Sequence, residues 1–192
     1  MAELNICIDI DGTVTEANYW LAGANRFFGK DVDAQSVTDY EIHKVMGIRQ
    51  DDYTAFYEAL GEDIHWQSEI RQGAKRAIEQ LSMRNNIHFV TARQQDMHDV
   101  SADWLKTQGI RYDTLTLLGT SHKAGSAEAL QCDWFVEDSL SNATELSDAG
   151  FRVLLVDCSY NQGALPPGIR RVDNWYQIEA IIHGKTMEKV SA

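Results

Sequence analysis

The chain has 192 residues, 44% of them hydrophobic, with 17 Lys and Arg against 29 Asp and Glu and a formal net charge of −12. A chain of this length can bury about two-thirds of its unfolded surface, which is enough for one α/β core with a modest insertion. Nucleic acids and anionic membranes are bound through clustered Lys and Arg, so the charge balance argues against both as partners.

The cysteines and the N-terminal residues indicate the compartment. Cys7, Cys132 and Cys158 lie far apart without a CxxC spacing, so we expect small buried side chains rather than a disulfide framework or a zinc site. Glu3 and Asp9 flank a short apolar run that lacks the basic start and the length of a signal peptide. Since no run approaches the roughly eighteen apolar residues of a membrane span, we expect a cytoplasmic protein.

In chain order, five short apolar runs, each followed by polar residues, are predicted to form strands. They cover residues 4–9, 87–91, 114–119, 134–138 and 152–157. Helical patterns are found at residues 74–83, 97–107, 124–130, 142–149 and 175–182. Near-continuous apolar runs separated by helices are typical of strands covered on both faces, so the pattern predicts an α/β fold with a parallel sheet. Residues 159–168, which hold both prolines, are predicted to be a surface connection.

The connection between the first strand and the first of these helices is too long for a loop. Within it, residues 16–28 and 51–60 have helical composition, and residues 37–46 are a third candidate. We therefore expect a small helical cap, residues 16–71, inserted after the first strand. The core would then consist of residues 1–15 and 72–192.

Polar residues follow four of the predicted strands. In an open parallel sheet the ligand site lies beyond the carboxyl ends of the strands, so these residues are expected to converge. They are Asp9-Ile10-Asp11-Gly12-Thr13 after the first strand, Thr91-Ala92-Arg93 after the second, Lys123 after the third, and Glu137-Asp138 after the fourth. The sequence therefore predicts several carboxylates, one lysine and one threonine at a single edge of the sheet.

The first of these groups suits phosphoryl chemistry. Asp9, at the end of a rigid strand, can present its carboxylate as a nucleophile toward phosphorus. Gly12 permits the turn that brings Asp11 back over the same site, where it can act as an acid and then as a base. A carboxylate that approaches a phosphate dianion is repelled by about 4 kcal/mol per pair of unit charges at 4 Å in an effective dielectric of about 20, so a cation is required.

The remaining groups can supply the cation and hold the phosphate. Asp9 and Asp138, from neighbouring strands, form an oxygen ligand set that fits Mg²⁺ better than Zn²⁺. Lys123 adds a second positive charge, and Thr91 with nearby backbone N–H groups can hold phosphoryl oxygens. Glu137 is interpreted instead as an acid at the start of the following helix.

These motifs, in this order, resemble the four motifs of the haloacid dehalogenase (HAD) superfamily. The position of the insert, the string Val37-Thr38-Asp39-Tyr40, and the run Phe135-Val136-Glu137-Asp138-Ser139-Leu140-Ser141-Asn142-Ala143 are similar to the 5′(3′)-deoxyribonucleotidase branch, including its bacterial nucleotidase-like members. The resemblance implies a three-layer, Rossmann-like core and a Mg²⁺-dependent phosphomonoesterase that forms an aspartyl-phosphate. The implied substrate is a small phosphate monoester, foremost a (deoxy)nucleoside monophosphate.

The resemblance also implies a role for each matching residue. Asp9 becomes the nucleophile and a magnesium ligand, and Asp11 becomes the acid/base and a ligand through its backbone carbonyl. Asp138 becomes the third protein ligand. The implied phosphate binders are Thr91, Ala92, Arg93 and Lys123.

Two positions depart from the pattern of the superfamily. Asn142 stands where many members have a second acid, so a lower metal affinity is expected. Ala92-Arg93 replaces the Ser-Pro of the mammalian nucleotidases, so their substrate preference does not carry over. Arg93 itself is interpreted in two ways, as a contact to a substrate phosphate or as the partner of a surface acid.

The insert is rich in aromatic residues that could face a nucleobase. Tyr19 and Trp20 follow Asp11 closely and are expected to overhang the phosphate site, where stacking on a base contributes about 1 to 3 kcal/mol. Aromatic residues at helical spacing also form the core of a small cap, and both interpretations stay open.

Several alternatives remain beside the nucleotidase hypothesis. A phosphatase of sugar phosphates or other small metabolites would use the same core, and a phosphate-binding protein without catalysis would be consistent with Asn142. A receiver-like signalling module is disfavoured because its phosphorylated Asp ends the third strand. A dinucleotide oxidoreductase is disfavoured because the first strand is followed by Gly12 without GxGxxG. The oligomeric state, monomer or homodimer, stays open.

Overall fold

The computed structural model describes residues 3–190, which form a parallel sheet of six strands in the order β3-β2-β1-β4-β5-β6. The strands are β1 (Asn5–Ile8), β2 (Asn86–Thr91), β3 (Thr114–Leu117), β4 (Trp134–Glu137), β5 (Val153–Val156) and β6 (Ile169–Val172). Every pairing is parallel, and β1 lies between β2 and β4. This topology confirms the predicted α/β fold with a parallel sheet.

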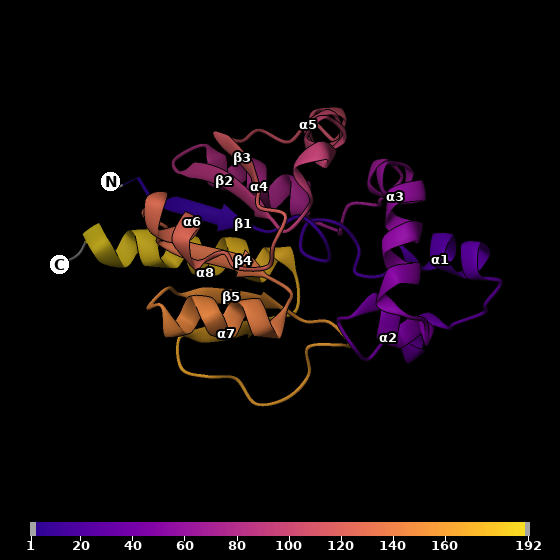
Figure 1. The fold of residues 1–192 in the computed structure, drawn as a ribbon. Coiled ribbons are helices and arrows are strands. Elements are labelled where there is room, and N and C mark those ends of the chain that lie inside the picture. The colour runs from indigo at the N-terminus through magenta and orange to yellow at the C-terminus, as the bar shows by residue number, and fades with distance from the viewer. Residues whose placement is uncertain (1–2, 191–192) are drawn as a thin grey trace.

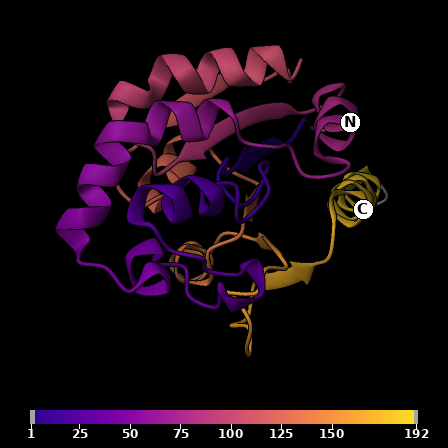
Figure 2. The same ribbon diagram turned by 90° about the vertical axis from the view of Figure 1, so that its right-hand side faces the viewer.

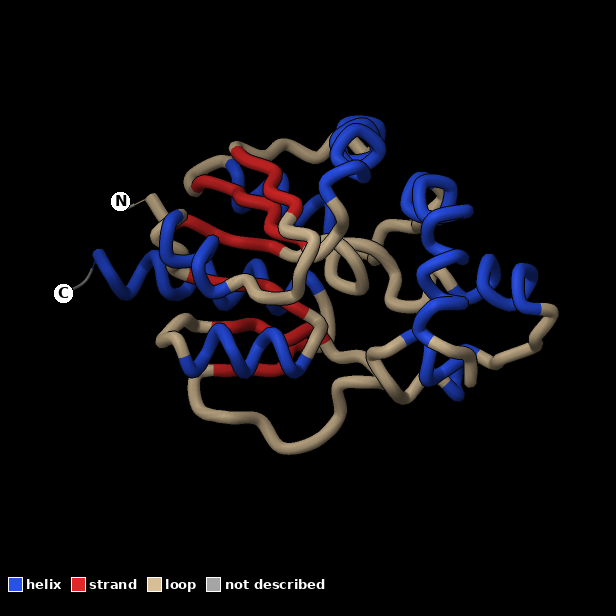
Figure 3. The backbone as a smooth tube through the Cα atoms, in the orientation of Figure 1, coloured by secondary structure: helices blue, strands red, loops and turns tan. Residues whose placement is uncertain are grey.

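Helices cover both faces of the sheet (Figures 1 and 3). They are α4 (Ala74–Ser82), α5 (His98–Thr107), preceded by the short 3-10 helix η2 (Gln95–Met97), α6 (Ala124–Ala129), α7 (Leu140–Asp148) and α8 (Trp175–Val190). Side chains alternate along a strand, so Ile6 and Ile8 of β1 pack in one cluster with α4, α5 and α8. Cys7 packs in a second cluster with α6 and α7. The result is the expected three-layer core.

The insert lies beyond the carboxyl ends of the strands, on the right in Figure 1, and Figure 2 looks onto it from that side. Its helices are α1 (Leu21–Phe28), the 3-10 helix η1 (Ala34–Ser36), α2 (Ile42–Met46) and α3 (Gln50–Trp66). These segments bury an apolar cluster of their own: Trp20, Leu21, Ala24, Val37, Met46 and Phe56. The proposed cap therefore has its own core, while the exact division into residues 16–71 and the remainder stays a prediction.

The structure differs from the expected elements at β6 and at the bounds of several helices: α2 covers only Ile42–Met46 of the candidate 37–46, and α8 runs to Val190 and not to residue 182. β6 was not predicted, because Arg170 and Arg171 interrupt its apolar pattern. It is an edge strand that pairs with β5 alone, and its two middle residues reach solvent. The first helix begins at Leu21 rather than at residue 16, and α3 runs to Trp66 rather than to residue 60.

Two other expectations can be compared with the structure. Cys7, Cys132 and Cys158 are buried thiols without disulfide partners, as expected. Within residues 3–190 there is no helix with the length and apolar character needed to cross a membrane.

Candidate active site

The loop after β1 reaches the neighbouring strand through a close backbone approach. The backbone N–H of Asp9 donates to the carbonyl of Val136 on β4 (3.0 Å), which extends the pairing of the two strands. Gly12 has a φ of +76°, and a Cβ atom there would lie 2.3 Å from Oδ2 of Asp138. Arg71 holds this turn by donating to the Gly12 carbonyl (2.8 Å). Glycine is therefore required at this position for both its backbone conformation and its lack of a side chain.

Three buried carboxylates meet at the ends of β1 and β4. Oxygen atoms of Asp9, Glu137 and Asp138 lie within 4.8 Å of one another. Burial, followed by the neighbouring Glu137 carboxylate, raises the pKa of Asp138 to about 7. Carboxylate oxygens crowded away from water are stabilised by a divalent cation, and an all-oxygen donor set suits Mg²⁺. These residues therefore fit a metal ion of that class.

Lys123 enters the same cluster from the loop before α6. Its Nζ lies 2.5 Å from Oδ1 of Asp9 and 3.0 Å from Oε2 of Glu137, and the side chain is 1% exposed. Burial by itself would lower the pKa of Lys123, but the carboxylates of Asp9 and Glu137 hold it above its usual value. The ammonium group is therefore charged and fixed beside the Asp9 carboxylate.

Glu137 has a different place from the one expected. It is the last residue of β4 and is fully buried, whereas Ser139 is the N-cap of α7 and accepts a hydrogen bond from the Asn142 N–H. One carboxylate oxygen of Glu137 pairs with Lys123, and the other accepts a hydrogen bond from Nδ2 of Asn142 (2.6 Å). The interpretation of Glu137 as an acid of the following helix is wrong, because its side chain turns inward to the buried lysine.

Asp138 is held from three directions. Thr13 donates to its Oδ1 (3.1 Å), the hydroxyl of Tyr160 donates to its Oδ2, and Nδ2 of Asn161 donates to its backbone carbonyl (2.7 Å). Tyr160 and Asn161 lie in the connection after β5, and the sequence analysis did not identify them. Neither belongs to a recognisable motif, so no signal in one sequence could have found them.

Arg93 pairs with Asp11, an acid of the site and not one of the surface, while its contact to a substrate phosphate stays a prediction. Its Nε and Nη2 donate to the two carboxylate oxygens of Asp11 (2.8 and 2.6 Å), and its Nη1 donates to Ser101 (2.8 Å). Burial alone would raise the pKa of Asp11, but Arg93 and then His65 hold it well below its usual range. In this structure Asp11 is therefore a carboxylate.

Thr91, the last residue of β2, is buried, and its hydroxyl accepts a hydrogen bond from the Arg93 N–H (3.3 Å). Ala92 and Arg93 line a cavity, whereas Asp9 and Lys123 lie beneath it, each less than 5% exposed. The sequence-derived site residues are thus brought to one edge of the sheet, as the topology predicts.

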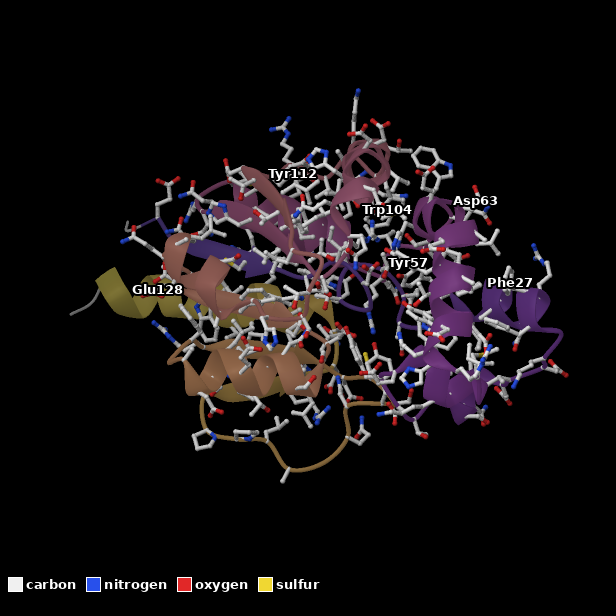
Figure 4. All side chains as sticks on the ribbon, in the orientation of Figure 1. Phe27, Tyr57, Asp63, Trp104, Tyr112 and Glu128 are labelled. Carbon is white, nitrogen blue, oxygen red and sulfur yellow. The ribbon has the colours of Figure 1, made fainter. Side chains whose placement is uncertain are left out.

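A cavity of about 1200 Å³ separates the strand ends from the insert. Its floor includes Asp11, Arg93 and Asp138, and its opposite wall carries aromatic side chains of the insert: Tyr19, Trp20, Tyr40, Tyr53 and Tyr57. Figure 4 shows Tyr57 on the side of α3 that faces the core, whereas Phe27 lies on α1 at the far end. Trp20 is 7% exposed and also belongs to the apolar cluster of the insert. The Tyr19 hydroxyl lies 3.4 Å from Nδ1 of His65.

Comparisons with known proteins agree with this geometry. Residues 3–187 match the family described as 5′ nucleotidase, deoxy (pyrimidine), cytosolic type C protein. The nucleotidase CA_C3379 of Clostridium acetobutylicum is 43% identical over 182 residues, which are 95% of each chain.

Solved structures share the fold. The haloacid dehalogenase-like hydrolase SP0104 of Streptococcus pneumoniae superposes with a TM-score of 0.70 at 14% identity, covering 94% of this chain and 98% of that one. The HAD-type protein YfnB of Bacillus subtilis, solved with bound magnesium, gives a TM-score of 0.63 at 10% identity, covering 95% and 100%. At these identities the likeness shows the architecture alone.

Proposed function

The chain belongs to this 5′ nucleotidase family of the HAD superfamily and is a phosphomonoester hydrolase, and from that premise we propose that it hydrolyses a (deoxy)nucleoside monophosphate with Mg²⁺ through a phosphorylated Asp9. One observation carries the proposal. Oδ1 of Asp9 lies 2.5 Å from Nζ of the buried Lys123, and the Asp9 carboxylate clusters with those of Glu137 and Asp138. A nucleophile, a fixed positive charge and a cation site are thus combined at one point.

The metal would be held by Asp9, Asp138 and the backbone carbonyl of Asp11. When bound, Mg²⁺ supplies positive charge that offsets the repulsion between the Asp9 carboxylate and a phosphate dianion. Lys123 provides a second, permanent positive charge, since its ammonium group is pinned by Asp9 and Glu137. Positioning and charge neutralisation are most of what phosphoryl transfer requires of a protein.

In the first half of the proposed reaction, an oxygen of Asp9 forms a bond to phosphorus as the bond to the leaving oxygen breaks. Asp11, once protonated, gives its proton to that oxygen. An approaching phosphate dianion favours the protonated form of Asp11, because a like charge raises the pKa of a carboxyl group. In the second half, Asp11 takes a proton from the water that attacks phospho-Asp9. Thr91, Ala92 and Arg93 are the proposed contacts to the phosphoryl oxygens.

The cavity supports a nucleoside as the leaving group. Its volume of about 1200 Å³ exceeds what a phosphate alone requires, and its wall on the insert side offers aromatic faces. Such faces stack on any base. Tyr19 and Trp20 remain the proposed substrate contacts of the cap, although the Tyr19 hydroxyl already contacts His65.

The substrate proposal is tested with a panel of phosphate monoesters, assayed with Mg²⁺ and with EDTA. The panel contains ribonucleoside and deoxyribonucleoside monophosphates and several sugar phosphates. We expect turnover that requires Mg²⁺ and is fastest for a nucleoside monophosphate. A preference for a sugar phosphate would replace the substrate class, and no turnover of any member would overturn the proposal.

The nucleophile is tested with Asp9→Asn and with Asp157→Asn as the matched control. Asp157 follows β5 as Asp9 follows β1, but its side chain is 42% exposed and pairs with Arg171. Asp9→Asn is expected to lower kcat by at least about 10⁴-fold, as removal of a covalent nucleophile does, while the control keeps its activity. Borohydride reduction of enzyme quenched during turnover should convert Asp9 into homoserine. Activity retained by Asp9→Asn would refute this assignment.

A further inference from the structure

His65, near the end of α3, makes a contact to the active site that no motif predicts. The side chain is 3% exposed, and its Nδ1 lies 3.6 Å from Oδ1 of Asp11 and 3.4 Å from the hydroxyl of Tyr19. Its Nε2 lies 2.8 Å from the hydroxyl of Tyr57, also on α3. The imidazole is therefore buried between a helix of the insert and the carboxylate proposed as the acid.

The surroundings select one tautomer of this imidazole. Burial, followed by Arg93, lowers the pKa of His65 to about 4, so a neutral ring carries a single N–H. With that hydrogen on Nε2, the Nδ1 lone pair would face the negative charge of Asp11. With it on Nδ1, the ring donates toward Asp11 and Tyr19, and the Tyr57 hydroxyl donates to Nε2. The first arrangement also gives each ring nitrogen a partner, because Tyr19 can donate to Nδ1 and the Tyr57 oxygen can accept from Nε2. The second is favoured because it turns an N–H, and not a lone pair, toward the Asp11 carboxylate.

A neutral donor has a specific use beside a carboxyl group that must carry a proton. Arg93 matches the ionised form of Asp11, since its two N–H groups need two acceptor oxygens. Once protonated, the carboxyl group keeps one acceptor oxygen and gains one donor. In this structure the 3.6 Å from Nδ1 of His65 to Oδ1 of Asp11 is longer than a hydrogen bond, and catalytic contacts of this kind often shorten only in the substrate complex. A hydrogen bond formed there leaves the proton on Oδ2, the only other oxygen of that side chain.

We propose that His65 is a positioning residue that orients the carboxyl group of Asp11 for proton transfer to the leaving oxygen, a role that rests on the proposed function of Asp11. As the bond between phosphorus and the leaving oxygen breaks, the proton moves from Oδ2 of Asp11 to that oxygen. His65 keeps its own proton throughout, and Tyr57 fixes its ring. A helix of the insert thereby contributes to proton transfer in the core.

The test compares two substrates that differ in one atom. One is the best nucleoside 5′-monophosphate of the panel, and the other is its analogue with sulfur in place of the bridging 5′ oxygen. A thiolate leaves without a proton, so a defect in proton donation affects only the oxygen ester. The readout is the ratio of the two kcat/KM values measured on one protein preparation. This ratio does not depend on the fraction of folded enzyme.

His65→Phe keeps an aromatic ring and removes the N–H, whereas His65→Asn keeps an amide N–H near the position of Nδ1. His65→Phe is expected to lower kcat/KM for the oxygen ester by about 100-fold, within the range for a general acid, and for the sulfur ester by less than about 3-fold. For the oxygen ester, kcat/KM of His65→Asn should be about 10-fold higher than that of His65→Phe. The exposed neighbour Trp66, as Trp66→Ala, serves as the control for the end of the helix.

The outcomes separate this inference from the proposed function. Equal losses for the two esters in His65→Phe, or no loss in either, would overturn the positioning role. If His65→Phe does not fold, the other two variants decide. A ratio of the two kcat/KM values equal to that of the wild-type protein in both His65→Asn and Tyr57→Phe would also overturn the positioning role. Asp11→Asn must itself show the preference for the sulfur ester. If it does not, or if the wild-type protein turns over no monophosphate, the proposed function is what fails.

Discussion

Arg93 and Asp11, 82 positions apart in the chain, form a two-pronged ion pair with contacts of 2.8 and 2.6 Å across the floor of the cavity. The Arg93 side chain is 1% exposed and that of Asp11 is 26% exposed. The Arg93 charge is therefore shielded from bulk water, and its partner is the Asp11 carboxylate, which is partly exposed where it lines the cavity. The pair fixes the loop after β1 to the loop after β2, on which the proposed acid and the proposed phosphate contacts lie.

Removing one partner of this pair should destabilise the protein more than removing both. Arg93→Met leaves the Asp11 carboxylate partly buried without its cation, and we expect a loss of about 2 to 3 kcal/mol in the free energy of unfolding. Adding Asp11→Asn to that variant should restore part of the loss. Urea unfolding at pH 7 measures both effects. Arg49→Met is the matched control, because Arg49 makes the same two-pronged contact to Asp52 on the surface. A loss as large in the control would contradict the role of burial.

Gly12→Ala should disturb the metal site as well as stability. The added Cβ would lie 2.3 Å from Oδ2 of Asp138 and 2.6 Å from the Tyr160 hydroxyl, so Asp138 has to move. Gly29→Ala is the control, since Gly29 also has a positive φ, +61°, but a Cβ there has nothing within 4 Å. The control should lose about 1 kcal/mol from backbone conformation alone. Only Gly12→Ala should also weaken Mg²⁺ binding in calorimetric titrations, and equal Mg²⁺ affinities would rule out the predicted displacement.

Asn142→Asp tests what the amide contributes beside the carboxylates. The Nδ2 group of Asn142 donates to Glu137 (2.6 Å), and an aspartate there would replace a donor with a further negative charge beside the three buried carboxylates. Without metal, the variant should be less stable by about 1 to 3 kcal/mol. With saturating Mg²⁺ the variant should gain more in Tm than the wild-type protein, because the added charge strengthens cation binding. Equal gains would show that this position does not influence the metal.

The buried His65 should make stability depend on pH. Its pKa is lowered to about 4 in the folded protein, against about 6.5 in the unfolded chain. Between these values the unfolded state binds more protons, so the free energy of unfolding decreases as the pH falls from about 6.5 to 4. Over this range the wild-type protein should lose about 3 kcal/mol relative to His65→Asn. Urea unfolding of both proteins in EDTA at a series of pH values measures this difference, and a constant difference would contradict a neutral buried imidazole.

The layout of the core could be predicted because its signals are local. The apolar runs are strands buried on both faces, and the parallel topology carries their last residues to the same edge. Asp9, Lys123 and Asp138 therefore meet as expected. β6 was not predicted because an edge strand does not need a continuous apolar run, and its two arginines interrupt the apolar pattern.

The sequence alone determined which residue types end the strands, and hence the class of chemistry, because strand periodicity and a glycine turn act over a few residues. Only the tertiary structure decided the partners: Arg93 with Asp11, Glu137 with Lys123, and His65 with Asp11 from a separate helix. The physical reason is that a buried charge is stabilised by whichever opposite or polar group the packed chain brings within about 3 to 4 Å. In a chain with 29 acidic residues, that choice depends on the whole fold and on no local pattern.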